Sequence, residues 1–276
     1  MTGRSDTDKF DAIEKAIARD LRHRGIGGLV RWGSLESAAR SLSGAGKAVV
    51  LSGFYLNETR SGETDGPPGA KAVGEALEAI GVEVAHVTDG VSLALYSAMG
   101  VPVLLFVPEA LNSLSPSHLL AIERAGRAGD GRYYSMSGKD ITSHTAPLDD
   151  WFLAAPGLGI ATIAIGDGGN EIGMGVVREQ VARDVPHGGK IASTVGADHL
   201  IVSGISNYGA YGLAAALSVI AGRDLLPTDA AAGQAVEDCV AAGACCGHTH
   251  QNAPLVDGTP LETAFALLAE LRQLIA

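Results

Sequence analysis

The residues best suited to chemistry lie in one glycine-rich stretch, Gly166-Asp167-Gly168-Gly169-Asn170-Glu171, which follows an apolar run from Ala161 to Ile165. The run has the pattern of a buried strand, and a helix-compatible pattern resumes after the glycines. Ligands bind at such strand-to-helix corners in open α/β sheets, and glycines let them approach the main chain. Two carboxylates here, Asp167 and Glu171, suit a hard divalent cation with oxygen ligands.

Two other interpretations of this stretch must be weighed. Asn170 could cap the helix and Glu171 could favour its positive end, which explains Glu171 but not Asp167. A dinucleotide fingerprint is excluded because its third glycine would fall on Glu171, whose charge repels pyrophosphate. The sequence therefore predicts a site for a metal or a polar substrate, with Gly168, Gly169 and Asn170 beside the substrate.

A second acidic pair, Glu63 and Asp65, lies in the long polar corner 53–69, which follows an apolar strand at Ala48–Ser52. The two acids stand two residues apart in an irregular segment and could converge on one cation. Capping of the following helix, Ala70–Ile80, explains Asp65 equally well. Both interpretations stay open.

Two more corners carry polar candidates. Asp89 comes directly after the strand Val82–Val87, where capping of the next helix is the simpler explanation and cation binding the alternative. Ser206 and Asn207 follow the strand His199–Ser203 and are expected to orient a substrate carboxylate, together with the free N–H groups that begin a helix. These corners would share the carboxyl edge of a parallel sheet.

The pattern as a whole predicts one α/β domain over residues 1–276, with a mostly parallel central sheet and helices on its faces. Residues 1–45 are expected to form a helical N-terminal extension, and residues 130–147 an irregular loop with the weak candidates Lys139, Asp140 and His144. Further strands are expected at 101–107, very apolar and hence central, and at 161–165. Helices are expected at 10–24, 34–42, 91–99, 117–127 (capped by Ser115 or Ser117), 151–155, 206–220, 229–242 and 261–275.

The amino-acid composition limits the kinds of binding partner and cellular compartment that we expect. The net charge of −11 argues against nucleic acid and anionic membranes as partners. No apolar run reaches the roughly 18 residues of a membrane span, and the polar start lacks a signal-peptide pattern, so we expect a cytoplasmic protein. Three cysteines indicate a reducing compartment, and Cys245-Cys246-Gly247-His248 does not have the spacing of a zinc site.

Four segments together resemble the D-glutamate cyclase C-terminal domain family. They are Gly62-Glu63-Thr64-Asp65-Gly66-Pro67, Ala146–Phe152, Gly166–Gly175 and Ala197-Asp198 through Asn207-Tyr208-Gly209. The matches span about residues 53–217 in the family's order. One departure is Cys245-Cys246-Gly247, where an acid is expected before the glycine.

The resemblance implies an enzyme, a lyase that interconverts D-glutamate and 5-oxo-D-proline with loss or gain of water. A divalent cation, Mg²⁺ or Mn²⁺, would polarise the carboxylate under attack, and a second acid would carry the proton. The expected metal ligands are Glu63, Asp65, Asp89, Asp167 and Glu171, and the expected catalytic acids are Asp65, Asp167 and Glu171.

Two alternatives remain. Clustered acids with a cation also suit a metal-dependent hydrolase of another small anionic or phosphorylated substrate. The chain could instead be a non-catalytic binding module, because longer family members carry an N-terminal domain that resembles a hydro-lyase. In that case it would act with a separate hydro-lyase-type partner; a homo-oligomer is also left open.

Overall fold

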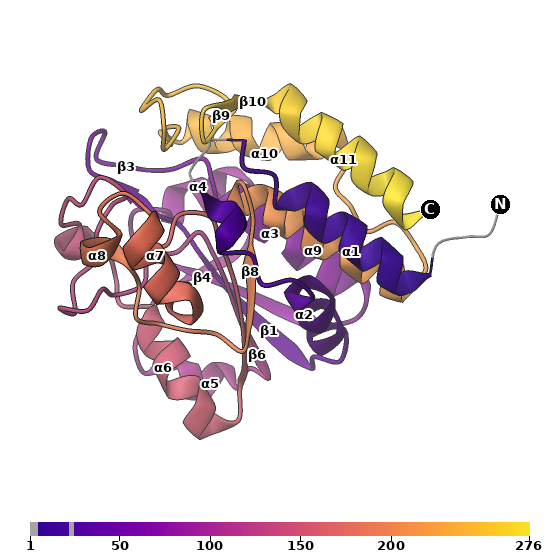
Figure 1. The fold of residues 1–276 in the computed structure, drawn as a ribbon, viewed down its shortest axis with the longest axis horizontal. Coiled ribbons are helices and arrows are strands. Elements are labelled where there is room, and N and C mark those ends of the chain that lie inside the picture. Colours follow the sequence, from indigo (N-terminus) through magenta and orange to yellow (C-terminus); the bar gives the residue numbers. More distant parts are fainter. Residues whose placement is uncertain (1–4, 22–24) are drawn as a thin grey trace.

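The computed structural model describes residues 5–21 and 25–276 and shows an α/β fold of layers around one central sheet (Figure 1). Within these residues the sheet has six strands, all parallel, in the order β5-β4-β1-β6-β7-β8. The predicted fold class is confirmed. The strands are β1 (Lys47–Ser52), β4 (Glu83–Thr88), β5 (Val103–Leu105), β6 (His118–Ile122), β7 (Ala161–Gly166) and β8 (His199–Val202).

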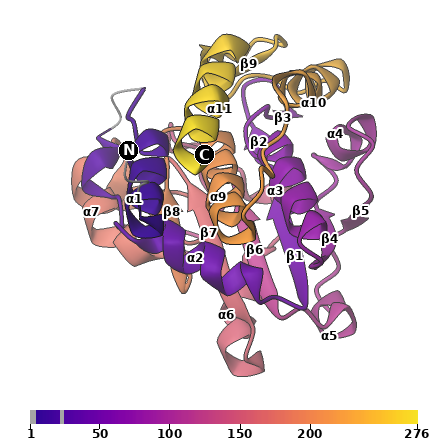
Figure 2. The same ribbon diagram turned by 90° about the vertical axis from the view of Figure 1, so that its right-hand side faces the viewer.

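Helices cover both faces of the sheet, as Figures 1 and 2 show from two sides. On one face α2, α3 and α9 lie near the strands, and α1 and α11 lie over α9. On the other face Trp151, Phe152 and Val181 join the apolar core beneath the sheet. The helices are α1 (Asp6–Ile17), α2 (Ser34–Ser43), α3 (Pro67–Ala79), α4 (Leu93–Ala98), α5 (Ala110–Leu114), α6 (Asp149–Leu158), α7 (Arg178–Asp184), α8 (Gly188–Ile191), α9 (Ser206–Ala221), α10 (Asp229–Ala241) and α11 (Leu261–Ile275).

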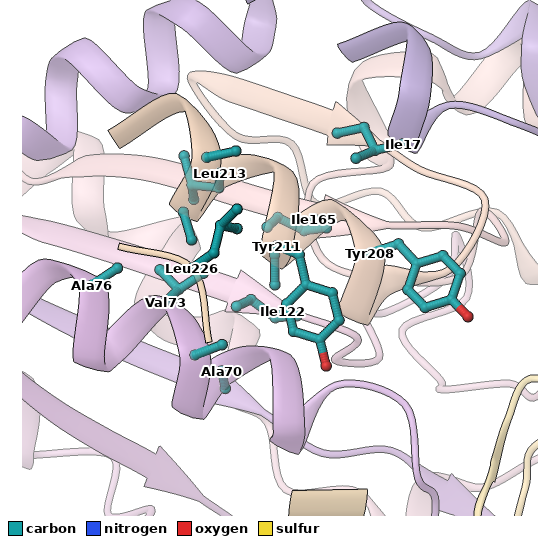
Figure 3. Close-up of a cluster of buried hydrophobic side chains, with 14 of the residues drawn as sticks. Ile17, Ala70, Val73, Ala76, Ile122, Ile165, Tyr208, Tyr211, Leu213 and Leu226 are labelled. Carbon is teal, nitrogen blue, oxygen red and sulfur yellow. The ribbon is translucent and has the colours of Figure 1, made fainter. Parts of the chain in front are cut away.

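Helix α9 is the centre of the larger core. Its residues from Ser206 to Ser218 are all buried, as expected of a helix that is apolar on every side. Figure 3 shows Tyr211 and Leu213 of α9 among side chains of α3, β6 and β7. Alanines and glycines in α9 allow neighbours to approach closely. A Cβ on Gly69 of α3, for example, would stand 2.9 Å from the Ala210 Cβ.

The strand order places a ligand site. In chain order the strands run 3-2-1-4-5-6 across the sheet, so the winding direction reverses between β1 and β6. Ligands of such doubly wound sheets bind at the carboxyl ends of the strands beside this reversal. The residues that follow β1 and β6, Gly53 and Glu123, are therefore favourably placed for function.

Two sequence predictions about strands are wrong. The helix expected at 117–127 is instead β6, whose five residues are all buried between β1 and β7. Leucine, alanine and glutamate favour helices, but tertiary burial of a short apolar run decided for a strand. The strand expected at 101–107 forms only β5, and it lies at the edge of the sheet, not at its centre.

The other predicted elements differ mainly at their ends. The first helix ends at Ile17, and residues 22–24 of the predicted helix lie outside the described part of the chain. Two hairpins, β2–β3 (Tyr55–Leu56, Ser61–Gly62) and β9–β10 (Leu255–Val256, Thr259–Pro260), flank the site described below. No helix of the described residues is long and apolar enough to cross a bilayer.

Candidate active site

A cavity of about 260 Å³ opens at the carboxyl end of the sheet. Acidic groups dominate its lining, and none of the described residues that line it is Lys or Arg. Its basic groups are two histidines on the segment before β9. The lining comprises Phe54, Leu56, Glu58, Glu63, Asp65, Glu123, Ser135, Met136, Ser137, Asp167, Asn170, Gly247, His248, His250 and Asp257.

Asp167 lies at the centre of the buried acids. One carboxylate oxygen from each of Asp65, Asp167 and Asp257 lies within 4.8 Å of the others, and the same holds for Glu123, Asp167 and Glu171. All five carboxylates are buried. Because every donor is a carboxylate oxygen, these groups suit a hard divalent cation such as Mg²⁺ or Mn²⁺. Asp65, Asp167 and Glu171, which the sequence predicted as ligands, are brought together here.

Glu63 is buried beside these acids with an unsatisfied oxygen. Its Oε1 finds no hydrogen-bond partner among the described residues. Burial raises the pKa of Glu63 well above its ordinary value, and the charges of Asp65 and Asp257 raise it further. A buried carboxylate with an unpartnered oxygen, facing a cavity lined by other acids, fits a bound cation that would satisfy and neutralise it.

Glu171 has a different environment, although it belongs to the same acidic group. Its Oε1 accepts the N–H groups of Asp167 and Gly168 at 3.1 and 2.6 Å, and its Oε2 accepts the N–H of Gly169 at 2.6 Å. The carboxylate therefore fixes the glycine turn and aims Asp167 at the cavity. The N–H groups of Gly168 and Gly169 both donate to Glu171 and are not available to a substrate. Asn170 lines the cavity, and its side-chain amide donates to the Tyr134 carbonyl at 2.7 Å.

We expect Glu63→Gln to stabilise the cation-free protein and to weaken its affinity for Mn²⁺. Folding raises the pKa of Glu63, so the folded protein favours the protonated carboxyl. The contribution of Glu63 to the free energy of unfolding is therefore fully present below the unfolded-state pKa and is lost as pH rises through the folded-state pKa. The gain from the neutral amide should therefore grow as pH rises above the ordinary pKa of a glutamate and reach about 1–3 kcal/mol. Thermal unfolding in chelator across this range measures it.

Glu171→Gln is the matched comparison. An amide nitrogen cannot accept a hydrogen bond, so at least one backbone N–H of the turn would lose its partner, at a cost of about 1–3 kcal/mol. The two substitutions remove the same charge but should shift the melting temperature in opposite directions. Equal destabilisation by both would show that the Glu63 carboxylate is satisfied in the folded protein.

Glu123 follows β6 directly and is a site residue that the sequence interpretation missed. Its backbone has φ +44°, a left-handed conformation that is rare for glutamate and that the surrounding structure must hold in place. Ser206 donates its hydroxyl to Glu123 Oε2 at 2.5 Å. Burial raises the Glu123 pKa well above its ordinary value, and the charge of Asp167 raises it further. The raised pKa and the cavity position suit Glu123 to proton transfer.

Asp65 is fixed by the start of helix α9 and does not cap the helix that follows it in the chain. Its Oδ2 accepts the Ser206 N–H at 2.9 Å, and its Oδ1 accepts the Asn207 N–H at 2.7 Å. The positive end of α9 thereby stabilises the carboxylate. Asn207 Oδ1 accepts the N–H groups of Gly66 and Gly69 at 2.9 and 2.8 Å. Ser206 and Asn207, expected beside the substrate, do not line the cavity and instead position Glu123 and Asp65.

Asp89 is held away from the acidic groups by a buried ion pair. Arg124 Nη1 donates to Asp89 Oδ2 at 2.6 Å, and Asp89 Oδ1 accepts the Val91 N–H at 3.1 Å. The same guanidinium binds the carbonyls of Gly53 at 2.9 Å and Ala146 at 2.6 Å. Arg124 thus ties together the segments that follow β1, β4 and β6. Asp89 does not cap α4, whose N-cap residue is Ser92 and which has no side-chain cap hydrogen bond. Its carboxylate instead binds Arg124 and the Val91 N–H, and it belongs to neither group of clustered acids.

Asp257 is the second site residue that the sequence interpretation missed. It lies in the β9–β10 turn with φ +50° and belongs to the acidic group with Asp65 and Asp167. The Asp257-Gly258 dipeptide is an ordinary turn signal and reveals nothing about a ligand. Cys246, where an acid was expected, accepts the Gly258 N–H at its sulfur at 3.0 Å and so supports this turn. Cysteine belongs to neither group of metal-ligand side chains found in the described residues.

Comparisons with known proteins assign this chain to a family. The human mitochondrial D-glutamate cyclase is 37% identical over 244 residues, which cover 78% of this chain and 40% of that protein. The chain thus spans less than half of this relative. A solved exopolyphosphatase-related protein from Bacteroides fragilis matches 89% of this chain and 57% of its own at 11% identity and a TM-score of 0.43, too weak a similarity to support any argument. The model of the family "D-glutamate cyclase-like, C-terminal" matches residues 13–272, and the chain belongs to that family.

Proposed function

We propose that this chain interconverts D-glutamate and 5-oxo-D-proline plus water with the help of a divalent cation, Mg²⁺ or Mn²⁺. Family membership and the name of the human relative support the reaction. The cation is supported by one observation above others: Glu63 is buried beside other carboxylates with an unpartnered oxygen. Without a positive charge at this place, the cavity would repel a dicarboxylate substrate.

Asp65, Asp167 and Asp257 would hold the cation, with Glu63 beside them. A divalent cation bound there would polarise the γ-carboxylate of D-glutamate and stabilise the negative charge on its oxygen during ring closure. Backbone N–H groups already fix the Asp65 carboxylate, and the Glu171-bound turn fixes Asp167. The ligands are therefore oriented before any cation or substrate arrives.

The two histidines of the cavity would orient the other end of the substrate. His248 and His250 line the cavity, and His250 is held in a left-handed conformation with φ +56°. As hydrogen-bond donors they suit the α-carboxylate of D-glutamate, which would then lie away from the buried acids. The buried acids and the two histidines would thus distinguish the two carboxylates of one small substrate.

Glu123 would carry the protons of the reaction. Ring closure forms a bond between the substrate nitrogen and its γ-carbon, breaks one carbon–oxygen bond and releases water. Two protons must move from the ammonium nitrogen to the departing oxygen. In its ionised form Glu123, held by Ser206, would take each proton from nitrogen, and its raised pKa makes the carboxylate basic enough to do so before it returns the proton to the departing oxygen.

Incubation of the purified chain with D-glutamate, L-glutamate and 5-oxo-D-proline, with and without Mg²⁺ or Mn²⁺, tests the proposal. We expect cation-dependent formation of 5-oxo-D-proline from the D enantiomer, its hydrolysis in reverse, and loss of both in chelator. Chiral chromatography of the products is the measurement. Turnover that is undiminished in chelator would refute the cation. Turnover that appears only with a hydro-lyase-type partner would favour the binding-module alternative.

A further inference from the structure

The two edges of the central sheet differ sharply in how they are covered. At one edge, Leu200, Ile201 and Val202 of β8 are all buried, and α2 packs against the strand. At the other edge, β5 lies at the rim of the molecule between α4 and α5 (Figure 2). There Leu104 is 49% exposed and Leu105 is 52% exposed. An uncovered apolar edge strand is a template for pairing with another strand.

The segment around β5 carries no charge. Residues 91–108 contain no Asp, Glu, Lys or Arg, in a chain whose net charge is −11. Proteins protect an open sheet edge by short strands, flanking prolines or charged side chains; β5 is short and lies between Pro102 and Pro108, but it carries no charged side chain. Val107 adds a third exposed apolar side chain immediately beyond the strand. Two copies of this acidic chain could approach each other at this segment with little local repulsion.

The backbone of β5 points to a strand as the occupant. Neighbouring residues of a strand face opposite sides of the sheet, so the exposed Leu104 and Leu105 leave both faces uncovered at this edge. The Phe106 N–H binds the Thr88 carbonyl of β4 at 2.8 Å. Because strand residues alternate in direction, the N–H and C=O of Leu105 point away from β4. A strand paired here would bind these groups and cover both side chains together.

We propose that β5 pairs antiparallel with β5 of a second copy, about a two-fold axis at Leu105, and joins two sheets into one. Such an interface uses the same surface on both copies, so each Leu105 would donate its N–H to the other and accept in return. Pro102 and Pro108 bracket the strand and restrict the pairing to the residues between them. The inference is independent of the proposed reaction.

Sedimentation or light scattering of the full chain tests the dimer. We expect twice the chain mass of 28.1 kDa for the wild type, and a monomer for Leu105→Lys. Leu158→Lys is the matched control, because Leu158 of α6 is equally exposed at 51%, and this variant should stay dimeric. A wild type that is monomeric at about 100 µM, a concentration at which specific interfaces are occupied, would refute the proposal.

A cysteine variant decides the matter if the lysine variant fails to fold. Opposed residues of an antiparallel pair have Cα atoms about 5.5 Å apart, within reach of a disulfide. Leu105→Cys should therefore form a covalent dimer on mild oxidation, whereas Leu158→Cys should not. The native Cys239, Cys245 and Cys246 are all buried and should not interfere. Equal crosslinking of both variants, or of neither, would overturn the proposed axis.

Discussion

Asp167→Asn is expected to remove both cation binding and turnover. Asp167 is buried and belongs to both groups of three neighbouring carboxylates. A cation bound by either group would therefore contact or lie close to the Asp167 carboxylate. An amide keeps the shape but supplies a neutral and weaker ligand to a hard cation. We expect kcat/KM to fall by about 10³-fold, or about 4 kcal/mol of transition-state stabilisation.

The measurements for Asp167→Asn are titration calorimetry with Mn²⁺ and the chiral product assay. Asp184→Asn is a suitable control, because Asp184 is an exposed acid of α7 that pairs with Arg183. Replacing Asp184 should change neither the affinity for Mn²⁺ nor the rate of product formation. Circular dichroism would establish that both variants are folded. Wild-type Mn²⁺ affinity in a folded Asp167→Asn protein would remove this residue, and the cation site built on it, from the proposal.

Arg124→Met is expected to destabilise the protein strongly, because it breaks a buried ion pair. The side chains of Arg124 and Asp89 are 1% and 7% exposed, and the methionine would leave Asp89 buried without its cation. Removing one partner of a buried ion pair costs about 3–5 kcal/mol because the remaining charge is unpaired. The carbonyls of Gly53 and Ala146 would lose their donor as well.

Chemical denaturation of Arg124→Met measures this cost. Arg183→Met is the matched control, because the Arg183–Asp184 pair is 69% and 42% exposed, and an exposed pair contributes at most about 1 kcal/mol. Adding Asp89→Asn to Arg124→Met should restore part of the stability by removing the unpaired charge. A double variant no more stable than Arg124→Met would show that the carbonyl contacts, and not the ion pair, carry the effect.

Much of the fold could be predicted from the sequence alone. Alternation of short apolar runs with helical patterns indicated an α/β fold, and β1, β4, β7 and β8 were found close to their true positions. Local signals suffice where an apolar run is bounded by glycines or polar turns, as at β7. They failed at β6, where leucine and alanine suit a helix as well as a strand, and burial between β1 and β7 decided.

The error at β6 also hid part of the site. The helix predicted at 117–127 concealed that Glu123 and Arg124 follow a central strand, so neither residue was predicted to belong to the site. Asp257 was overlooked for a different reason, since it lies in an ordinary turn far from the other acids in the chain. The three residues gain their significance only from contacts across the fold, Glu123 and Asp257 with Asp167, and Arg124 with Asp89.

The sequence by itself determined the chemical character of the site: acids at glycine-rich corners, with Asp167 and Glu63 among them, in a chain of the D-glutamate cyclase-like family. Only the tertiary structure distinguished the environments of these acids. Glu171 accepts three backbone N–H groups, Asp65 is held at the start of α9, and Glu63 has an unpartnered oxygen. The physical reason is that the energy of a buried carboxylate depends on the donors and charges that surround it, and residues distant in the chain supply them.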